Sequence, residues 1–303
     1  MINLIYAKVK FVRNLKDYAF QHKISNSQQS DILKLCTNAV NDSGLKCVEL
    51  KDTSDNVINS LLAQGLLEND FVLNSQNKGF ASSDNTTIQI NSKNHIEIFS
   101  QDINLYKAYK KTKDIDKILC NKLSFAYNDK YGFLTPDIKN IGSGISIECK
   151  IMLPALNQIN AIKTLPKISE KLLFNIECID YESGMCLIYT GANLGYTEKQ
   201  ICELTHSYIN KIMELEIKAS KALLNDDVDE ILDCNARAKA VLKNCIKIEP
   251  REVYALIGNI LIAINSEQEK EIDLIQINKV LQQCNYFNEN PKELAKNIQK
   301  ILN

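Results

Sequence analysis

The sequence predicts an α+β protein, in which helices flank a mostly antiparallel sheet and an all-helical C-terminal domain follows. Three observations carry this prediction. Short segments alternate apolar and polar residues, which is typical of strands with one buried face. Longer segments between them place apolar residues at helical spacing. From about residue 228 onward, helical spacing alone continues. Such an order is typical of an α+β domain joined to a helical one.

Five segments alternate as strands do. They are residues 5–11, 86–90, 95–99, 145–153 and 185–190. Asn91-Ser-Lys-Asn94 supplies turn residues between the second and third of them, which predicts a β-hairpin. Pro154 closes the fourth. The hairpin is the evidence that the pairing is mostly antiparallel.

Helical spacing predicts helices between and after these strands. Within the sheet region they are residues 27–40, 54–67 and 103–120, and a long helix runs from Thr197 through Ala219. Thr197 and Gln200 form the capping box that starts this long helix. Asn225-Asp-Asp227 interrupts its apolar stripe. We therefore expect one domain over residues 1–225 and a helical domain over 226–303, with helices at 228–246, 250–265, 272–284 and after Pro291.

Composition excludes several classes of function. The 303 residues carry a net charge of −1, which gives no reason to expect binding to nucleic acid or to an anionic membrane. No apolar run approaches the roughly 20 residues that span a bilayer. The first residues show neither a basic region nor a cleavage site, so we expect no signal peptide and a cytoplasmic protein.

The ten cysteines do not suggest a metal site. No two form a C-x-x-C pair, and none lies at ligand spacing from His22, His95 or His206. We expect them to be small, buried and reduced side chains.

Six segments match a known pattern in order. They are Lys8–Phe20, Asn91–Ile98, Phe125–Thr135, Asn140–Gly144, Leu153–Leu156 and Asn193–Glu198. They resemble the protein-arginine kinase branch of the ATP:guanido phosphotransferases, whose sequences there read S-S-R-x-R-x-A-R-N-L, N-E-E-D-H-x-R-I, F-A-Y-x-x-x-x-G-Y-L-T, N-x-G-T-G, L-P-A-L and T-L-G-x-S-E. The resemblance covers nearly the whole chain and implies a guanido-kinase catalytic domain followed by the helical tail.

The resemblance also implies a reaction, the transfer of the γ-phosphoryl group of Mg·ATP to a guanidinium nitrogen. Arginines must neutralise the triphosphate, because their planar forks bind phosphate oxygens bidentately. One or two carboxylates must orient and deprotonate the guanidinium. Catalysis of this kind rests on positioning and electrostatics, so loss of the charges removes it.

This chain has lost those charges. The five arginine positions that the resemblance assigns to phosphate fall on Lys8, Lys10, Glu97, Ser146 and Leu172. The whole chain has three arginines, Arg13, Arg237 and Arg251, so a shifted alignment does not restore the set.

The acids of the family are also mostly replaced. The catalytic glutamate of N-E-E-D-H falls on Lys93, and the cysteine before P-T-N falls on Asp137. Glu177 matches the second catalytic acid, although an ordinary surface glutamate explains it equally well.

Other matched residues are expected to serve the fold. Gly142 and Gly144 suit a tight turn better than a phosphate loop, and His95 is expected to pack at the hairpin end. In the tail, Lys292–Ile298 lacks the R-D-x-x-R-A motif that carries phospho-arginine binding in the family. The apolar stripe between Val253 and Ile264 fits a domain core better than a dimer face.

We therefore expect a pseudokinase that acts by binding, with no cofactor and no metal site. The resemblance implies a role in the arginine-phosphorylation and Clp proteolysis stress response. Its partners would be an active arginine kinase, an activator protein or a Clp chaperone, and a homodimer fits the helical tail. The alternative is a divergent active phosphotransferase that uses Mg·ATP, Lys8, Lys10 and Glu177 with an arginine acceptor.

Overall fold

The computed structural model describes residues 3–165, 173–191, 194–286 and 290–303. The chain forms two compact units. The strand-rich unit comprises Tyr6–Glu148 and Tyr189–Thr205, and the helix-rich unit comprises Met1–Ile5, Cys149–Ile188 and His206–Asn303. The division into these two units does not test the domain boundary predicted after residue 225, so that boundary stays a prediction.

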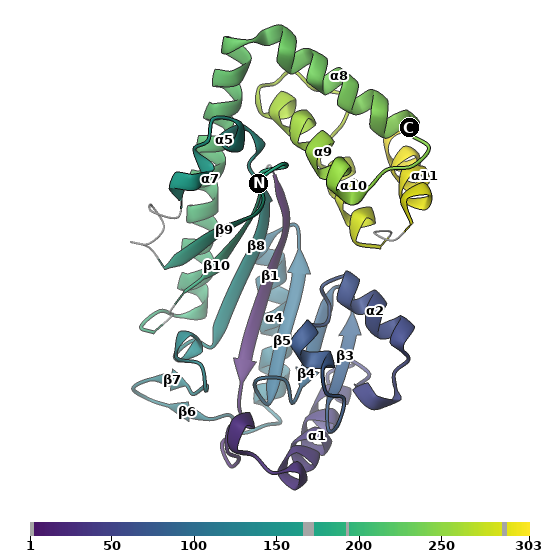
Figure 1. Ribbon diagram of the computed structural model, residues 1–303. Helices are drawn as coiled ribbons and strands as arrows, with labels where there is room; N and C mark the ends of the chain where they lie inside the picture. Colours follow the sequence, from purple (N-terminus) through teal and green to yellow (C-terminus); the bar gives the residue numbers. More distant parts are fainter. Residues whose placement is uncertain (1–2, 166–172, 192–193, 287–289) are drawn as a thin grey trace. The chain divides into compact units, whose positions relative to one another are not determined.

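The strand-rich unit is built on an antiparallel sheet, as predicted (Figure 1). Its strands follow the order β2-β3-β4-β5-β1-β8. They are most of β1 (Leu4–Arg13), β2 (Val48–Glu49), β3 (Gly79–Ser83), β4 (Thr86–Ile90), β5 (Ile96–Asp102) and the first half of β8 (Ile145–Met152). The predicted hairpin is β4 and β5, with Ile88 opposite Ile98. In the β1–β5 pair, Lys10 lies opposite Phe99 and Val12 opposite Glu97.

The two faces of this sheet differ in chemistry. Because side chains alternate along a strand, Val9 and Phe11 of β1 point to one face and Lys8 and Lys10 to the other. The first face is apolar and packs on the helices α1 (Asn26–Asn41) and α4 (Leu105–Cys120). Thr112 Oγ1 of α4 donates a hydrogen bond to the Val9 carbonyl at 3.1 Å. The polar face is the one that bears on function.

A short segment covers the polar face. It holds α2 (Asp55–Ala63) and α3 (Asn69–Val72). The predicted helix over 54–67 is therefore too long, because Gly65 adopts φ +69° and ends the helical run. β3, which pairs with β2 and β4, was not predicted, since its sequence Gly-Phe-Ala-Ser-Ser lacks a clear alternation.

Beside the main sheet, a small hairpin pairs β6 (Tyr127–Asn128) with β7 (Gly132–Phe133). The turn before β8 confirms the structural role predicted for its glycines. Gly144 has φ +62°, and a Cβ there would lie 2.8 Å from the Val12 carbonyl oxygen. A side chain at this position is therefore excluded by both conformation and space.

The helix-rich unit combines the strand order β8-β10-β9 with a helical core. Its strands are the second half of β8, β9 (Phe174–Asp180) and most of β10 (Met185–Thr190). Its helices are α5 (Pro154–Gln158), most of α7 (Glu198–Asp226), α8 (Val228–Asn244), α9 (Pro250–Asn265), α10 (Leu274–Tyr286) and α11 (Pro291–Leu302). β9 was not predicted, although Phe174-Asn-Ile-Glu-Cys alternates and is a signal that could have found it.

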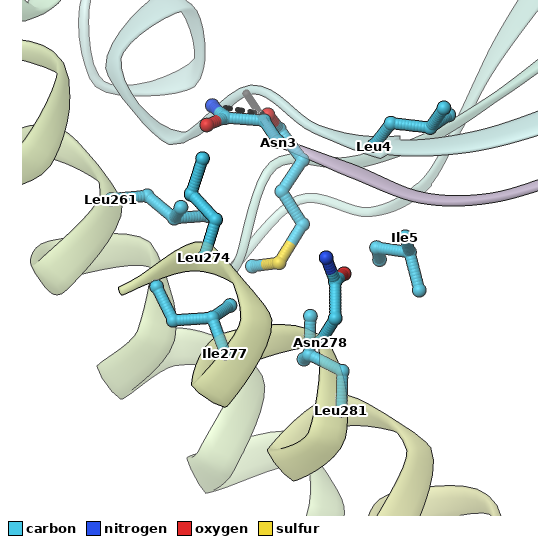
Figure 2. Close-up of a pocket in the computed structure, with 9 residues that line it drawn as sticks. Asn3, Leu4, Ile5, Leu261, Leu274, Ile277, Asn278 and Leu281 are labelled. Carbon is cyan, nitrogen blue, oxygen red and sulfur yellow. Dashed lines mark hydrogen bonds between the residues drawn. The ribbon is translucent and has the colours of Figure 1, made fainter. Parts of the chain in front are cut away.

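The stripe on α9 is a domain core, as predicted. Val253, Ile257, Ile260 and Leu261 are buried against α8, α10 and α11. The start of the chain joins this core (Figure 2), where the Asn3 amide donates to the Met152 carbonyl at 3.0 Å. A cavity of about 10 Å³ remains there, room for about one water molecule. None of the helices in the described residues is both long and apolar enough to cross a membrane.

Glu216 of α7 is a fully buried carboxylate that caps a helix. It accepts hydrogen bonds from the backbone N–H groups of Ala155 (2.8 Å) and Leu156 (2.9 Å) at the start of α5. Burial raises the pKa of Glu216 from 4.5 to about 7, against the opposing effect of the two N–H donors. The folded state therefore holds this proton more tightly than the unfolded state does.

We expect this carboxyl to make stability depend on pH. Its contribution is fully present below pH 4.5 and is lost as the pH rises to about 7. The loss amounts to about 3 kcal/mol of unfolding free energy. Glu216→Gln should flatten that part of the profile in urea denaturation between pH about 5 and about 8. Glu214→Gln, on the exposed side of the same helix, is the matched control. An unchanged slope in Glu216→Gln would contradict the assignment.

Candidate functional site

The residues expected to meet phosphate lie partly together on the polar face of the strand-rich sheet. Lys8 and Lys10 are neighbours on that face of β1, because side chains two residues apart share a face. Glu97 joins them from β5, where it lies opposite Val12. Three of the positions that the resemblance assigns to phosphate thus lie on one surface.

The structure adds a fourth residue, Glu68, from the loop between α2 and α3. Lys10 Nζ lies 3.1 Å from Glu68 Oε1 and 3.5 Å from Glu97 Oε2. Lys8 Nζ lies 3.4 Å from the same Glu68 oxygen and 4.0 Å from the centre of the Phe99 ring. Two ammonium groups therefore face two carboxylates, and the cluster has no net positive charge.

These ion pairs are withdrawn from solvent. The side chains of Lys8, Lys10 and Glu97 are 12%, 22% and 2% exposed. Burial lowers the pKa of Lys8 despite the neighbouring Glu68. Burial would also lower the pKa of Lys10, but Glu97 and Glu68 raise it above its ordinary value. Burial opposes ionisation of Glu68, yet Lys10 and Lys8 lower its pKa. In Lys8, Lys10 and Glu68, the neighbouring opposite charges favour the ionised form against the effect of burial.

Apolar packing fixes the position of Glu68. Leu67 and Phe71, on either side of it, are buried with Leu50 and Phe80 in one cluster. The Gly65 carbonyl accepts a hydrogen bond from Gln101 Nε2 at 2.7 Å, which ties the same loop to β5. We missed Glu68 in the sequence because its role depends on a loop that folds back over the sheet. The buried flanking Leu67 and Phe71 are the only local signal.

The rest of the polar face does not supply a cationic site either. Glu97 Oε1 accepts a hydrogen bond from Asn94 Nδ2 at 2.9 Å. Gln89 lies between Phe80 and Glu97 in register and is fully buried. Its amide has no hydrogen-bond partner among the described residues, so it is a neutral group in a closed space. The residues of this face do not fit Mg·ATP, which requires several cationic donors.

The remaining predicted positions lie elsewhere. Lys93 is exposed at the tip of the β4–β5 hairpin, where Asp70 at 2.6 Å raises its pKa. Ser146 is half-buried on β8. Asp137 caps a short 3-10 turn by accepting from the Lys139 N–H at 3.0 Å. Leu172 lies outside the described residues.

Glu177, the matched acid, belongs to the helix-rich unit. It is exposed on β9 and lines a cavity of about 380 Å³. Lys163, Cys178, Tyr181 and Cys186 line the same cavity. An accessible carboxylate beside an amine and a phenol is chemically capable of binding a small polar group. None of the ten cysteines, all of which lie in the part of the chain that the structure describes, forms a disulfide bond.

His95 confirms its predicted structural role. It is fully buried, its Nδ1 accepts from the Leu15 N–H at 2.9 Å, and its Nε2 lies 2.9 Å from the Ala19 carbonyl. Burial lowers the pKa of His95. A neutral imidazole that donates through Nε2 satisfies both contacts.

Arg13 forms a second charged network that we did not predict. Its guanidinium is fully buried and pairs bidentately with Asp116, at 2.8 Å and 3.0 Å. Its Nη2 also donates to Glu198 at 2.8 Å, and its plane lies 3.7 Å from the centre of the Phe133 ring. Lys113 pairs with both acids. Every donor is directed inward to protein groups, so this arginine holds the fold together.

Comparisons with known proteins agree on one family. The family model described as ATP:guanido phosphotransferase, C-terminal catalytic domain, matches residues 28–219. A protein-arginine kinase from Clostridium kluyveri is 26% identical over 292 residues, covering 92% of this chain and 85% of that kinase. One from Halothermothrix orenii is 23% identical, covering 89% and 81%.

Solved structures show the same fold. The substrate-free duplicated taurocyamine kinase from Schistosoma mansoni superposes with a TM-score of 0.62 at 19% identity over 70% of this chain. Lombricine kinase gives a TM-score of 0.60 at 14% identity over 71%. This chain spans about a third (32%) of the duplicated taurocyamine kinase chain and 66% of lombricine kinase.

Proposed function

The chain belongs to the ATP:guanido phosphotransferase family, and from that premise we propose that it is a protein-arginine kinase homologue that has lost catalysis and acts by binding other proteins. The family match covers more than half of the chain, and the relatives match nearly all of it.

One observation carries the proposal: Lys8 and Lys10 both form ion pairs with Glu68. A triphosphate needs cations that are free to meet it, and phosphoryl transfer depends on such electrostatic stabilisation. Here the carboxylate of Glu68 lies within 3.4 Å of both ammonium groups. Phosphate would have to displace it and would then meet Glu97, whose charge at about 4 Å repels phosphate by roughly 1–4 kcal/mol.

The alternative, an active and divergent phosphotransferase, draws on a single feature. Glu177 is exposed and lines a cavity large enough for a guanidinium. In this alternative Glu177 orients an acceptor arginine and Lys8 and Lys10 hold the phosphates of Mg·ATP. It requires the α2–α3 loop to release both lysines.

Family membership suggests the setting of the binding role. The relatives are protein-arginine kinases. We propose that this chain works with such a system in Clp-dependent proteolysis under stress. Its partner would be an active arginine kinase, an activator protein or a Clp chaperone, and it would bind as a monomer or a homodimer.

Nucleotide binding separates the two candidates. We expect millimolar Mg·ATP to leave the melting temperature unchanged, because both lysines are engaged. A ligand present at 100 times its Kd would add about 2.7 kcal/mol of stability. The Clostridium kluyveri kinase, measured alongside, is the positive control.

Mass spectrometry supplies the decisive readout. We expect no phospho-arginine on a model protein substrate incubated with this chain and Mg·ATP. Phospho-arginine above the level of a no-enzyme control would overturn the pseudokinase proposal. For the binding role, sedimentation of this chain mixed with a purified active arginine kinase should show a complex.

A further inference from the structure

Two cysteines of the helix-rich unit have no part in the functions proposed above. Cys178 lies on β9 and Cys186 on β10, and these two strands are neighbours in the sheet. Only Tyr181–Gly184 join the strands, which makes them an antiparallel hairpin, because a parallel connection needs roughly a dozen residues or more. A bond between the two cysteines would therefore close a small loop.

The two cysteine side chains point to the same face of the hairpin. On β9, Phe174 and Ile176 are buried and Cys178 is half-buried, while the residues between them are exposed. On β10, Cys186 and Ile188 are buried. Since alternate residues of a strand share a face, both cysteines lie on the inner face of the hairpin. There the Cys186 thiol donates a hydrogen bond to the Cys178 sulfur, so the two sulfur atoms are neighbours.

The cavity that Glu177 lines gives access to this pair. Both cysteines line the same cavity of about 380 Å³. Cys178 is half-buried, whereas Cys186 is 1% exposed. A small molecule that enters the cavity therefore reaches the Cys178 sulfur first, and the Cys186 sulfur lies behind it.

We propose that Cys178 and Cys186 are a redox site, which forms a reversible disulfide when the chain meets a small-molecule disulfide such as oxidised glutathione. The Cys178 thiolate attacks one sulfur of the oxidant, the S–S bond of the oxidant breaks, and one glutathione leaves. The Cys186 thiolate then attacks the Cys178 sulfur and displaces the second glutathione. The two cysteines are oxidised, and the two glutathione molecules take up the two protons that the thiols lose. The new bond ties β9, which carries Glu177, to β10.

The acidity of the thiols sets the rate of this reaction. Burial raises the pKa of Cys178, although the hydrogen bonds from the Cys186 thiol and the Asp180 N–H lower it, and the Asp180 carboxylate raises it. Burial also raises the pKa of Cys186, and Cys178 and Glu216 add to this effect. Because the thiolate is the reactive form, exchange is slow at neutral pH. The equilibrium depends instead on how closely the two sulfur atoms are held, and the fold holds them side by side.

Peptide mapping by mass spectrometry tests the proposal on the full chain. The reduced chain is incubated with oxidised glutathione, the remaining thiols are alkylated, and the chain is digested after Glu182, which lies between the two cysteines. We expect the two cysteine peptides to stay joined, with two hydrogen atoms fewer than the free peptides, and dithiothreitol to separate them. The rate of joining should rise about tenfold per pH unit between about pH 7 and 9, since both thiols are mostly protonated there.

Single variants, each shown by circular dichroism to be folded, separate the roles of the two cysteines. Cys186→Ser should keep one glutathione on Cys178, because no second thiol displaces it. Cys178→Ser should leave Cys186 unmodified, because its sulfur is buried. Cys120→Ser removes an exposed cysteine of the strand-rich unit and is the matched control, which should form the disulfide at the rate of the parent chain.

Three results would overturn the proposal. They are cysteine peptides of the parent chain that separate without dithiothreitol, a disulfide from either cysteine to another cysteine of the chain in place of this pair, and glutathione on Cys186 in Cys178→Ser. The inference goes beyond the proposed function, since the reaction needs no protein partner. No nucleotide or arginine substrate enters these experiments, so their failure leaves the test of catalysis untouched.

Discussion

Arg13→Met is expected to lower the free energy of unfolding by about 3–5 kcal/mol, the cost of removing one partner from a buried ion pair. Methionine keeps most of the side-chain volume and removes the charge. Asp116 would then be buried without its bidentate partner, and the Val12 and Ser143 carbonyls would lose a donor. Urea denaturation monitored by circular dichroism measures the loss.

The surface arginine Arg237 provides the matched control. It is exposed and pairs with Asp233 at 2.6 Å, one helical turn away. Arg237→Met should cost less than about 0.5 kcal/mol, as exposed helix pairs do. A double variant, Arg13→Met with Asp116→Asn, should lose less than the sum of the single losses, because the two groups interact directly. A loss below about 1 kcal/mol for Arg13→Met would contradict the structural role given to this network.

Glu68→Gln is expected to convert the closed polar face into an anion-binding surface. The substitution leaves Lys8 and Lys10 with Glu97 as their one remaining carboxylate in the cluster described above. Stability should fall by about 2 kcal/mol, since hydrogen bonds to charged groups contribute roughly 1.5–3 kcal/mol. Inorganic triphosphate should restore it, by about 2.7 kcal/mol at 100 times its Kd.

Thermal melting with and without triphosphate measures this effect. The parent chain should show no stabilisation, because Glu68 already occupies both lysines. Glu49→Gln makes the same charge change in an exposed pair with Lys51 and should respond as the parent does. Equal melting curves for Glu68→Gln with and without triphosphate would contradict the idea that Glu68 prevents Lys8 and Lys10 from binding phosphate.

Elements with strong local sequence patterns were predicted from the sequence, and elements with weak patterns were not. The β4–β5 hairpin, β10 and the four helices after Asp227 were predicted because alternation, turn residues, caps and proline positions are read within a few residues. The end of α2 was placed too late, although Gly65 is a local stop signal: it adopts φ +69°, and the Gly65 and Leu66 N–H groups donate back to the Leu62 and Leu61 carbonyls. β3 has no alternation of its own, because covering helices lie on both faces of the sheet there.

Some features of the candidate site also follow from the sequence, and others depend on tertiary contacts. The loss of the arginine set follows from residue identity alone, since no fold can supply a guanidinium that the chain lacks. The two-residue spacing of Lys8 and Lys10 in an alternating segment is likewise enough to put both side chains on one face of a strand. Family, sheet and the shortage of arginines were thus determined by the sequence.

Only the tertiary structure decided which acidic side chains pair with Lys8, Lys10 and Arg13. Glu68 lies 58 residues after Lys10, Asp116 lies 103 residues after Arg13, and Glu198 lies 185 residues after it. Ion pairs over such separations form only because apolar surfaces bring distant loops and strands together. A pattern of neighbouring residues in the sequence does not predict that packing. Ser143 is a further case, because its buried hydroxyl has no hydrogen-bond partner within the described ranges, and both burial and missing partners are properties of the packed chain.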